Sequence, residues 1–384
     1  MAATRRAWCV GLATIALAAT LGGCNGGGGS AKNTTTSGDR ETSASSSSGK
    51  TKRIVFLTNG SDPFWDACRS GLEEGARKFN LEQDGYTVAM EVNNGKPQGQ
   101  IDKLRQFASQ GDVAAVAISV IQADNAAIVE EMRNLQKRGI KIITVDADVN
   151  REKFRDARKY YIGTDNIVGG RALGTAAKAI LKARNKSEGG YVQFAGFADN
   201  DNARNRMNGF KEAVGDAFTE KDSMSDSMDK SKARDNVRNA IANHPDLVAL
   251  VGIWAYNAPA ISQVVTETNT RDKHTVVSFD AQAVAIEEMA KGRIDAMVVQ
   301  NPFDMGFQTV RLLQAMLNDD QSTETEMFPS ADQPDGDIYS TGLRVVVPDE
   351  ETPLNPEMFD AKTVEFMKLS EFRKWLAMYK LSSS

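Results

Sequence analysis

The sequence predicts an α/β protein built from two similar doubly wound lobes, each a parallel sheet with helices on both faces. Short apolar runs alternate regularly with amphipathic helical segments along the chain. Several apolar runs lack the polar alternation of a half-exposed strand, as expected where both faces of a parallel sheet are covered. The alternation restarts near residue 160, and the roughly 330 residues after residue 51 exceed what one hydrophobic core usually supports.

The first unit is expected to alternate strands with helices. The helix after the first strand places Trp65, Cys68 and Leu72 on one apolar stripe, and Gly139 ends the third helix. Strands are predicted at 52–58, 86–92, 113–119 and 140–145, and helices at 64–79, 98–110 and 125–138.

The second unit repeats this alternation. Strands are predicted at 160–163, 191–195, 247–253, 275–279 and 296–300, and helices at 167–183, 202–214, 234–242, 258–268, 283–291 and 302–317. The run from Gly169 to Gly174 lacks phosphate-loop spacing, so its glycines indicate close helix packing. Residues 364–379 are predicted to form an amphipathic helix that packs on a lobe.

The N-terminus has the pattern of a secretory signal. Arg5 and Arg6 precede an apolar run at 7–20 that is too short for a permanent membrane span, and small residues follow. Leu21-Gly22-Gly23-Cys24 resembles the lipobox of bacterial lipoproteins, which implies cleavage before Cys24 and lipid on its thiol; an incidental cysteine is the alternative. Residues 25–50 are mostly Gly, Ser, Thr and Ala, which predicts a flexible tether.

Composition narrows the function classes. A net charge of −5 argues against nucleic acid as a partner. The mature chain keeps only Cys24 and Cys68, so no internal disulfide is expected, and Cys68 is predicted to be an inert core thiol. The two histidines, His244 and His274, have no companion at metal-ligand spacing. We therefore expect no metal and no cofactor.

Polar and aromatic residues follow the predicted strands. Ligands of doubly wound sheets bind beyond the carboxyl ends of the strands, so these residues are the candidate site. Carboxylates accept hydrogen bonds from neighbouring hydroxyls, a guanidinium donates several, and aromatic faces cover the apolar side of a ring, which together suit a neutral polyol. The candidate ligand-binding residues are Asp62, Phe64, Trp65, Asp146, Asp148, Arg206, Trp254, Asp280 and Gln300.

From about residue 52 to 347 the chain resembles the ribose/galactose type of periplasmic sugar-binding protein, which has the periplasmic binding protein type I fold and feeds ABC transporters. The resemblance is carried by motifs in the family's order. They are Asp62-Pro63-Phe64-Trp65, Val145-Asp146, Gly163-Thr164-Asp165-Asn166, Ala203-Arg204-Asn205-Arg206, Phe279-Asp280 and Gln300-Asn301-Pro302.

The resemblance implies that Phe64 and Trp65 sandwich a sugar ring. It also implies hydrogen bonds to the sugar hydroxyls from Asp62, Asp146, Arg206, Asp280 and Gln300. Two departures leave the sugar open: Ala147 stands where ribose binders have arginine, and Trp254 where they have asparagine. Asp148 could take the place of the missing arginine.

Several of these residues also have ordinary structural explanations. Asp62 could cap the first helix before Pro63. Phe64 and Trp65 could belong to the core, although adjacent helical positions point in different directions. Asp146 and Asp148 could form a solvated loop or a metal-binding pair, and Trp254 could pack in the core.

These features predict a three-crossover hinge, with crossings near 163–165, 300–301 and 339–343. The expected organisation is a signal peptide at 1–23, a lipidated linker at 24–51, an N-terminal lobe at 52–163 plus 302–341, and a C-terminal lobe at 164–301 plus 342–384. We expect a monomer in the periplasm or at the cell surface, lipid-anchored to the membrane, that closes around a monosaccharide and delivers it to an ABC transporter permease.

Three other functions remain open at this point. A chemosensory or quorum-signal receptor would share the binding mechanism and differ in its partner. An extracytoplasmic carbohydrate-active enzyme is disfavoured, because no nucleophile elbow or dinucleotide fingerprint is present. A DNA-binding regulator would need an N-terminal helix-turn-helix where this chain has its signal and tether.

Overall fold

The computed structural model describes residues 51–384. The predicted signal peptide, Cys24 and all but the last residue of the predicted linker lie outside the described residues. Within residues 51–384 no helix combines the length and the apolar character needed to cross a bilayer.

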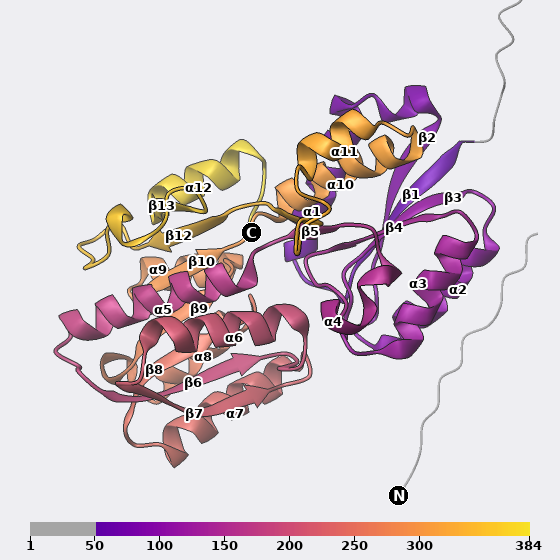
Figure 1. The fold of residues 1–384 in the computed structure, drawn as a ribbon. Coiled ribbons are helices and arrows are strands. Elements are labelled where there is room, and N and C mark those ends of the chain that lie inside the picture. Colours follow the sequence, from indigo (N-terminus) through magenta and orange to yellow (C-terminus); the bar gives the residue numbers. More distant parts are fainter. Residues whose placement is uncertain (1–50) are drawn as a thin grey trace, which may run out of the picture. The chain divides into compact units, whose positions relative to one another are not determined.

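The described residues contain two sheets, which confirms the predicted α/β fold of two parallel-sheet lobes (Figure 1). All neighbouring strands of the first sheet run parallel. Its order is β11 (Ile338–Ser340), β5 (Tyr161–Gly163), β4 (Lys141–Val145), β3 (Val113–Ile118), β1 (Lys52–Leu57) and β2 (Tyr86–Glu91).

The second sheet has one antiparallel pair, β10 with β12, and is otherwise parallel. Its order is β13 (Val364–Lys368), β12 (Leu343–Val347), β10 (Ala296–Val299), β9 (Thr275–Phe279), β8 (Leu247–Gly252), β6 (Gly189–Ala195) and β7 (Phe218–Ser225).

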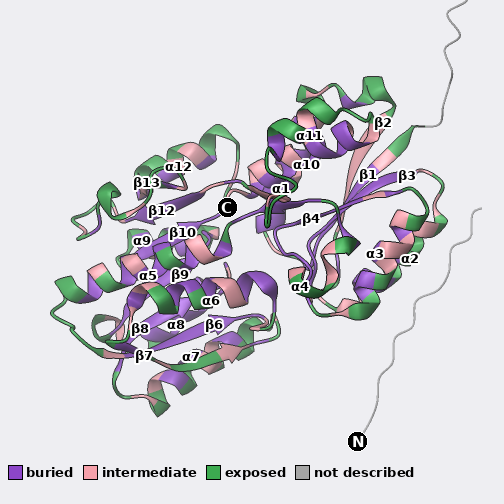
Figure 2. Cartoon of the chain, viewed as in Figure 1, coloured by how far each residue is buried: buried purple, intermediate pink, exposed green. Residues whose placement is uncertain are grey.

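Helices cover both faces of each sheet, and the buried residues lie between helix and sheet (Figure 2). The first lobe is the first sheet with α1 (Phe64–Lys78), α2 (Pro97–Ser109), α3 (Ala126–Lys137), α4 (Arg151–Phe154), α10 (Pro302–Leu317) and α11 (Gln321–Met327). The second lobe is the second sheet with α5 (Asn166–Ala183), α6 (Asp201–Val214), α7 (Lys230–Asn243), α8 (Asn257–Glu267), α9 (Ala283–Ala290) and α12 (Leu369–Met378).

The chain passes between the lobes three times. It leaves the first sheet after β5, returns to the first lobe after β10, and crosses again between β11 and β12. These passages lie where the motifs predict crossings. The domain boundaries themselves stay predictions.

Two parts of the second lobe differ from the sequence prediction. The predicted helix at 364–379 is wrong in its first third, because Val364–Lys368 pairs with β12 and the helix begins at Leu369. The alternation of buried Val364 with exposed Glu365 is the local sign of this strand. Strand β7 escaped prediction, because it is an edge strand with a mostly polar sequence.

The glycines of α5 serve close packing, as predicted. A Cβ on Gly170 would lie 2.2 Å from the backbone oxygen of Arg206, and one on Gly174 would lie 2.6 Å from that of Phe210. Such distances are far below van der Waals contact, so α5 and α6 approach backbone to backbone. This approach fixes the position of Arg206 on α6. Cys68 is fully buried, as predicted.

Candidate functional site: a pocket at the strand ends of both sheets

A pocket opens where the carboxyl ends of strands from both sheets face each other. Its cavity volume is about 60 Å³, counted as the space open to the centre of a water molecule. About 10–15 Å³ of such space suffices for one water, so the pocket has room for a small ligand. The lining residues are Asn59, Asp62, Phe64, Trp65, Asp146, Asn202, Arg206, Met228, Trp254, Ala255, Tyr256, Asp280 and Gln300.

Asp146 and Asp280 occupy equivalent positions in the two lobes. Asp146 follows β4 of the first sheet, and Asp280 follows β9 of the second. Both have left-handed backbones, with φ of 68° and 60°, which aspartate tolerates better than most residues. Strained backbone at both strand ends turns the two carboxyl groups into the pocket and is typical of functional sites.

Arg206 is almost fully buried and held from several sides. Its Nε donates to Oδ1 of Asn166 at 2.9 Å, and its Nη1 donates to the carbonyl of Ile253 at 3.1 Å. The guanidinium lies 4.4 Å from the ring centroid of Phe279, and its Nη1 is 3.7 Å from Oδ2 of Asp280. The remaining nitrogen, Nη2, has no hydrogen-bond partner in the described protein, so the guanidinium keeps unused donors.

Gln300 connects the first crossing between the lobes to the pocket through hydrogen bonds. The hydroxyl of Thr164, in the first crossing, donates to Oε1 of Gln300 at 2.8 Å. The amide nitrogen of Gln300 then donates to both carboxylate oxygens of Asp280 at 3.1 Å. The carboxylate is therefore oriented by a residue of the second crossing, which is itself oriented by a residue of the first.

Asp62 combines the two roles that the sequence left open. Its Oδ1 accepts from the backbone nitrogen of Phe64 at 3.0 Å, which satisfies a donor in the first turn of α1. Its Oδ2 accepts from the amide of Gln282 of the second lobe at 2.8 Å. Asp62 thus supports the helix, lines the pocket and joins the lobes.

The aromatic residues form a different arrangement from the expected sandwich. The rings of Phe64 and Trp65 have centroids 4.9 Å apart and planes at 88°, so they touch edge to face. No sugar ring fits between two rings in this contact, so the structure does not show the predicted sandwich. They form one wall together, and Trp254 and Tyr256 line the pocket from the second lobe.

Trp254 belongs to both the site and the packing of the second lobe. Its indole nitrogen donates to Oδ1 of Asn202 at 3.1 Å, and its ring meets Phe197 and Tyr256 edge to face. Because Trp254 also lines the pocket, the two interpretations of this residue are compatible.

Asp148 lies outside the pocket lining, contrary to its prediction as a ligand-binding residue. Its side chain is fully buried in the first lobe and accepts from Thr144, Arg151 and Arg158 at 2.6, 2.9 and 2.7 Å. Burial alone would raise its pKa, but Arg158, Arg151 and the hydroxyl of Thr144 together outweigh burial and lower the pKa. Within residues 51–384 no group of three His, Cys, Asp or Glu side chains is arranged to hold a metal ion.

Five lining residues were not predicted. Asn59 follows β1, and Ala255 and Tyr256 follow β8 directly after Trp254, so a consistent use of the strand-end rule would have found them. Asn202 lies in the first turn of α6, within reach of the arginine motif. Met228 follows β7, the strand that was missed.

Burial changes the ionisation of the pocket carboxyls. Desolvation raises the pKa of Asp146 to about 6, although Arg206 and the hydroxyl of Ser119 oppose it. Desolvation also raises the pKa of Asp280 and of Asp62. A ligand that donates hydrogen bonds to these groups favours their ionised forms.

Ligand binding should therefore weaken in acid. For a hydroxyl-donating ligand we expect roughly tenfold weaker binding at pH 5 than at pH 7.5, because protonation of Asp146 one pH unit below its pKa competes with the ligand. The stability of the ligand-free protein should change in the opposite direction. The pKa of Asp146 in the folded protein lies above its ordinary value of 3.8, so the folded protein holds this proton more tightly than the unfolded chain does. The contribution of Asp146 to stability is therefore lost as pH rises through about 6.

Calorimetric titration at both pH values measures the ligand effect, and Asp146→Asn is the matched variant. Asparagine also tolerates the left-handed backbone, so this change removes the titrating group with little strain. The pH profile should become flatter in this variant. An unchanged profile would assign the titration to another group.

Comparison with known proteins relates this geometry to a family. A family model described as a periplasmic binding protein domain matches residues 54–321. The D-allose-binding periplasmic protein of Escherichia coli is 26% identical over 265 residues, which is 67% of this chain and 82% of that protein. The ribose import binding protein RbsB of Bacillus subtilis is 20% identical over 259 residues, which is 66% of this chain and 79% of that protein.

Solved structures show the same fold. An ABC transporter solute-binding protein from Burkholderia graminis, in complex with D-arabinose, has a TM-score of 0.66 at 22% identity and covers 78% of this chain and 96% of its own. A periplasmic solute-binding protein from Actinobacillus succinogenes, with bound D-allose, has a TM-score of 0.63 at 19% identity and covers 77% and 97%. Because the family model spans more than half of the residues, this chain belongs to the family of periplasmic binding proteins.

Proposed function

We propose that this protein binds one neutral monosaccharide in the pocket between its lobes and delivers it to the permease of an ABC transporter. The observation that carries the proposal is the excess of carboxyl groups in a pocket with one guanidinium. Asp62, Asp146 and Asp280 supply acceptors, and Arg206 supplies the single positive charge among the lining residues. A ligand must therefore bring mainly donors, which is what the hydroxyls of a polyol offer.

The same charges disfavour other ligand classes. A phosphate or a sugar acid would meet the carboxyl groups at close range and in a buried setting, where like charges repel most strongly. The aromatic wall of Phe64 and Trp65 offers an apolar face to the carbon side of a sugar ring. The D-allose and D-arabinose in the solved structures named above support a monosaccharide as the ligand class.

The sequence supports an extracytoplasmic, lipid-anchored location. Leu21 to Cys24 resembles a lipobox, and the Gly/Ser-rich segment after it would serve as a tether. In this proposal the protein acts as a monomer, is not an enzyme, and uses no cofactor. Cys24→Ser tests the anchor, since this variant should move from the membrane fraction to the soluble fraction of cells.

A thermal-shift screen tests the proposed ligand class. Purified protein should be stabilised by one or a few neutral sugars from a panel that includes D-allose, D-ribose, D-arabinose, D-glucose and deoxysugars. The shift should grow with sugar concentration, because a ligand of the folded state alone raises its apparent stability. D-glucuronate serves as the anionic control and should give no shift.

The sugar should also be recovered unchanged after prolonged incubation, which separates binding from enzymatic turnover. A shift with the anionic control and with none of the neutral sugars would contradict the proposed function.

A further inference from the structure

A charged pair links the two lobes away from the pocket. Arg151 begins α4 of the first lobe, and Asp201 begins α6 of the second. Nη2 of Arg151 lies 3.8 Å from Oδ2 of Asp201, and neither residue is among those that line the pocket. The two lobes are therefore joined by an ion pair that a sugar in the pocket would not touch.

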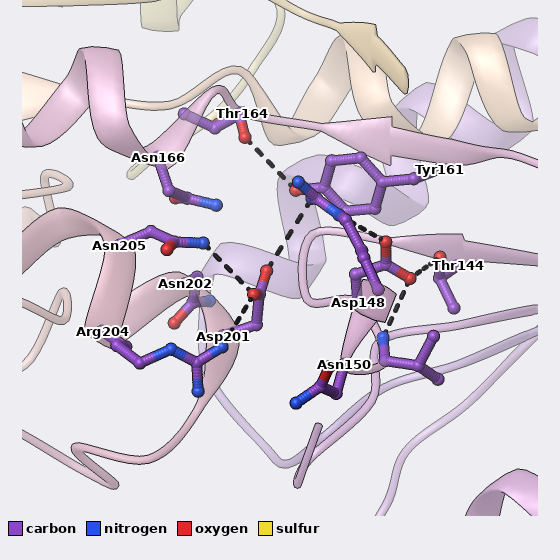
Figure 3. A network of polar contacts seen from close by, with 12 residues as sticks. Thr144, Asp148, Asn150, Tyr161, Thr164, Asn166, Asp201, Asn202, Arg204 and Asn205 are labelled. Carbon is purple, nitrogen blue, oxygen red and sulfur yellow. Dashed lines mark hydrogen bonds and ion pairs between the residues drawn. The ribbon is translucent and has the colours of Figure 1, made fainter. Parts of the chain in front are cut away.

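Arg151 is held in place by its own lobe. Its Nε donates to Oδ2 of Asp148 at 2.9 Å, and its guanidinium lies 4.9 Å from the ring centroid of Tyr161. Asp148 is fixed in turn by Arg158 and Thr144. Figure 3 shows the carboxylates of Asp148 and Asp201 turned toward the same space. Contacts within the first lobe therefore hold the guanidinium of Arg151 in position without a contribution from the second lobe.

Asp201 has one carboxylate oxygen in use and one without a hydrogen bond. Oδ1 accepts from the amide of Asn205 at 3.1 Å and lies 3.3 Å from Nη2 of Arg204 (Figure 3). Oδ2 is buried and has no hydrogen-bond partner among the described residues, and this is the oxygen that faces Arg151. A buried carboxylate oxygen without a donor is costly, and a nearby guanidinium reduces that cost.

We propose that Arg151 and Asp201 form an interlobe latch that favours the closed form and so raises sugar affinity without touching the sugar. This inference rests on the proposed function. The pair exists only when the lobes are together, since Asp148 keeps Arg151 on the first lobe and α6 keeps Asp201 on the second. A contact present only in the closed form increases the closed fraction, and the apparent dissociation constant falls in proportion.

Two residues of the second lobe, Gln282 and Asn200, also donate hydrogen bonds to the first lobe. The amide of Gln282 donates to Asp62, and the amide of Asn200 donates to the carbonyl of Ile121 at 3.2 Å. Asp62 lines the pocket, and Asn200 caps α6. Of these contacts, the Arg151–Asp201 pair can therefore be changed with the least effect on the pocket and on local structure.

Calorimetric titration with the best sugar of the thermal-shift screen tests the latch. Arg151→Gln and Asp201→Asn should each weaken binding by roughly tenfold, mainly through faster dissociation. The double variant should be no weaker than the single variants, because both changes remove the same interaction. Arg133→Gln is the matched control, since Arg133 pairs with Asp156 inside the first lobe at 2.7 Å. This variant should bind sugar with the affinity of the unchanged protein.

The variants should keep their fold. Asp148 retains Arg158 when Arg151 is replaced, so no buried carboxylate of the first lobe is left alone. The melting temperature without sugar should stay near that of the unchanged protein. Arg151→Lys provides a second variant that keeps a positive charge, and it should recover part of the affinity lost in Arg151→Gln.

A distance measurement between the lobes distinguishes failure of the latch from failure of the proposed function. Fluorescent labels on the outer faces of α2 and α7 should report a more open average form for Arg151→Gln and Asp201→Asn without any sugar. If the unchanged protein binds no sugar, the proposed function fails, and this opening still tests the latch. If affinity and opening are unchanged in both variants, or if only Arg151→Gln has an effect, the latch is wrong.

Discussion

Replacing Asp280 with asparagine is expected to remove nearly all sugar binding while the protein stays folded. Asp280 is almost fully buried, lines the pocket, and is oriented by two hydrogen bonds from Gln300. A carboxylate that accepts from two sugar hydroxyls contributes about 1.5–3 kcal/mol for each bond, so we expect a loss of affinity of roughly a hundredfold or more. Calorimetry and the sugar-induced thermal shift measure this loss.

Asparagine is a sharper choice than alanine at this position. The backbone of Asp280 has a φ of 60°, which asparagine adopts with little strain and alanine does not. Asp319→Asn is the matched control, because Asp319 also has a left-handed backbone, with φ of 55°, but is exposed and outside the pocket. Full sugar binding by Asp280→Asn would remove Asp280 from the site.

Replacing Arg206 with lysine is expected to weaken sugar binding strongly and also to reduce stability. The guanidinium satisfies Asn166 and the carbonyl of Ile253, packs on Phe279, and leaves Nη2 for the ligand. A single ammonium cannot reach all of these partners in a planar fork. We expect sugar affinity to fall by roughly a hundredfold and the free energy of unfolding to fall by about 2 kcal/mol.

Calorimetry measures the first effect of Arg206→Lys and urea unfolding without sugar measures the second. Arg171→Lys is the control, because Arg171 is exposed on α5 and pairs with Glu212 at the surface. Loss of stability with undiminished sugar binding would show that Arg206 supports the fold and does not bind the ligand.

The sequence predicts most of this architecture because strands of a parallel sheet carry their own signal. The runs at β3 and β8 are apolar throughout, as expected for strands whose side chains are buried on both faces of the sheet. The edge strand β7 has no such signal, since its Lys221 and Asp222 are exposed and its Glu220 is half-buried. Strand β13 looks helical because it is short and runs directly into α12.

In the candidate site, too, a residue is predictable only where the local sequence pattern determines its position. Asp146 and Asp280 are predictable, because each directly follows a buried strand that ends at the same edge of a sheet. Asp148 lies two residues further, and its direction depends on Arg158, a partner ten positions away that no local pattern identifies. The orientation of the Trp65 ring likewise depends on packing against Phe56, and Phe64 in turn meets Trp65 edge to face, contacts that the sequence does not reveal.

A crystal structure with the most stabilising sugar tests the central claim most directly. The account predicts one sugar in the pocket between the lobes, with hydroxyls within hydrogen-bond distance of Asp146, Asp280 and Nη2 of Arg206. A sugar bound elsewhere on the protein, or in this pocket without a hydrogen bond to either carboxylate, would contradict it.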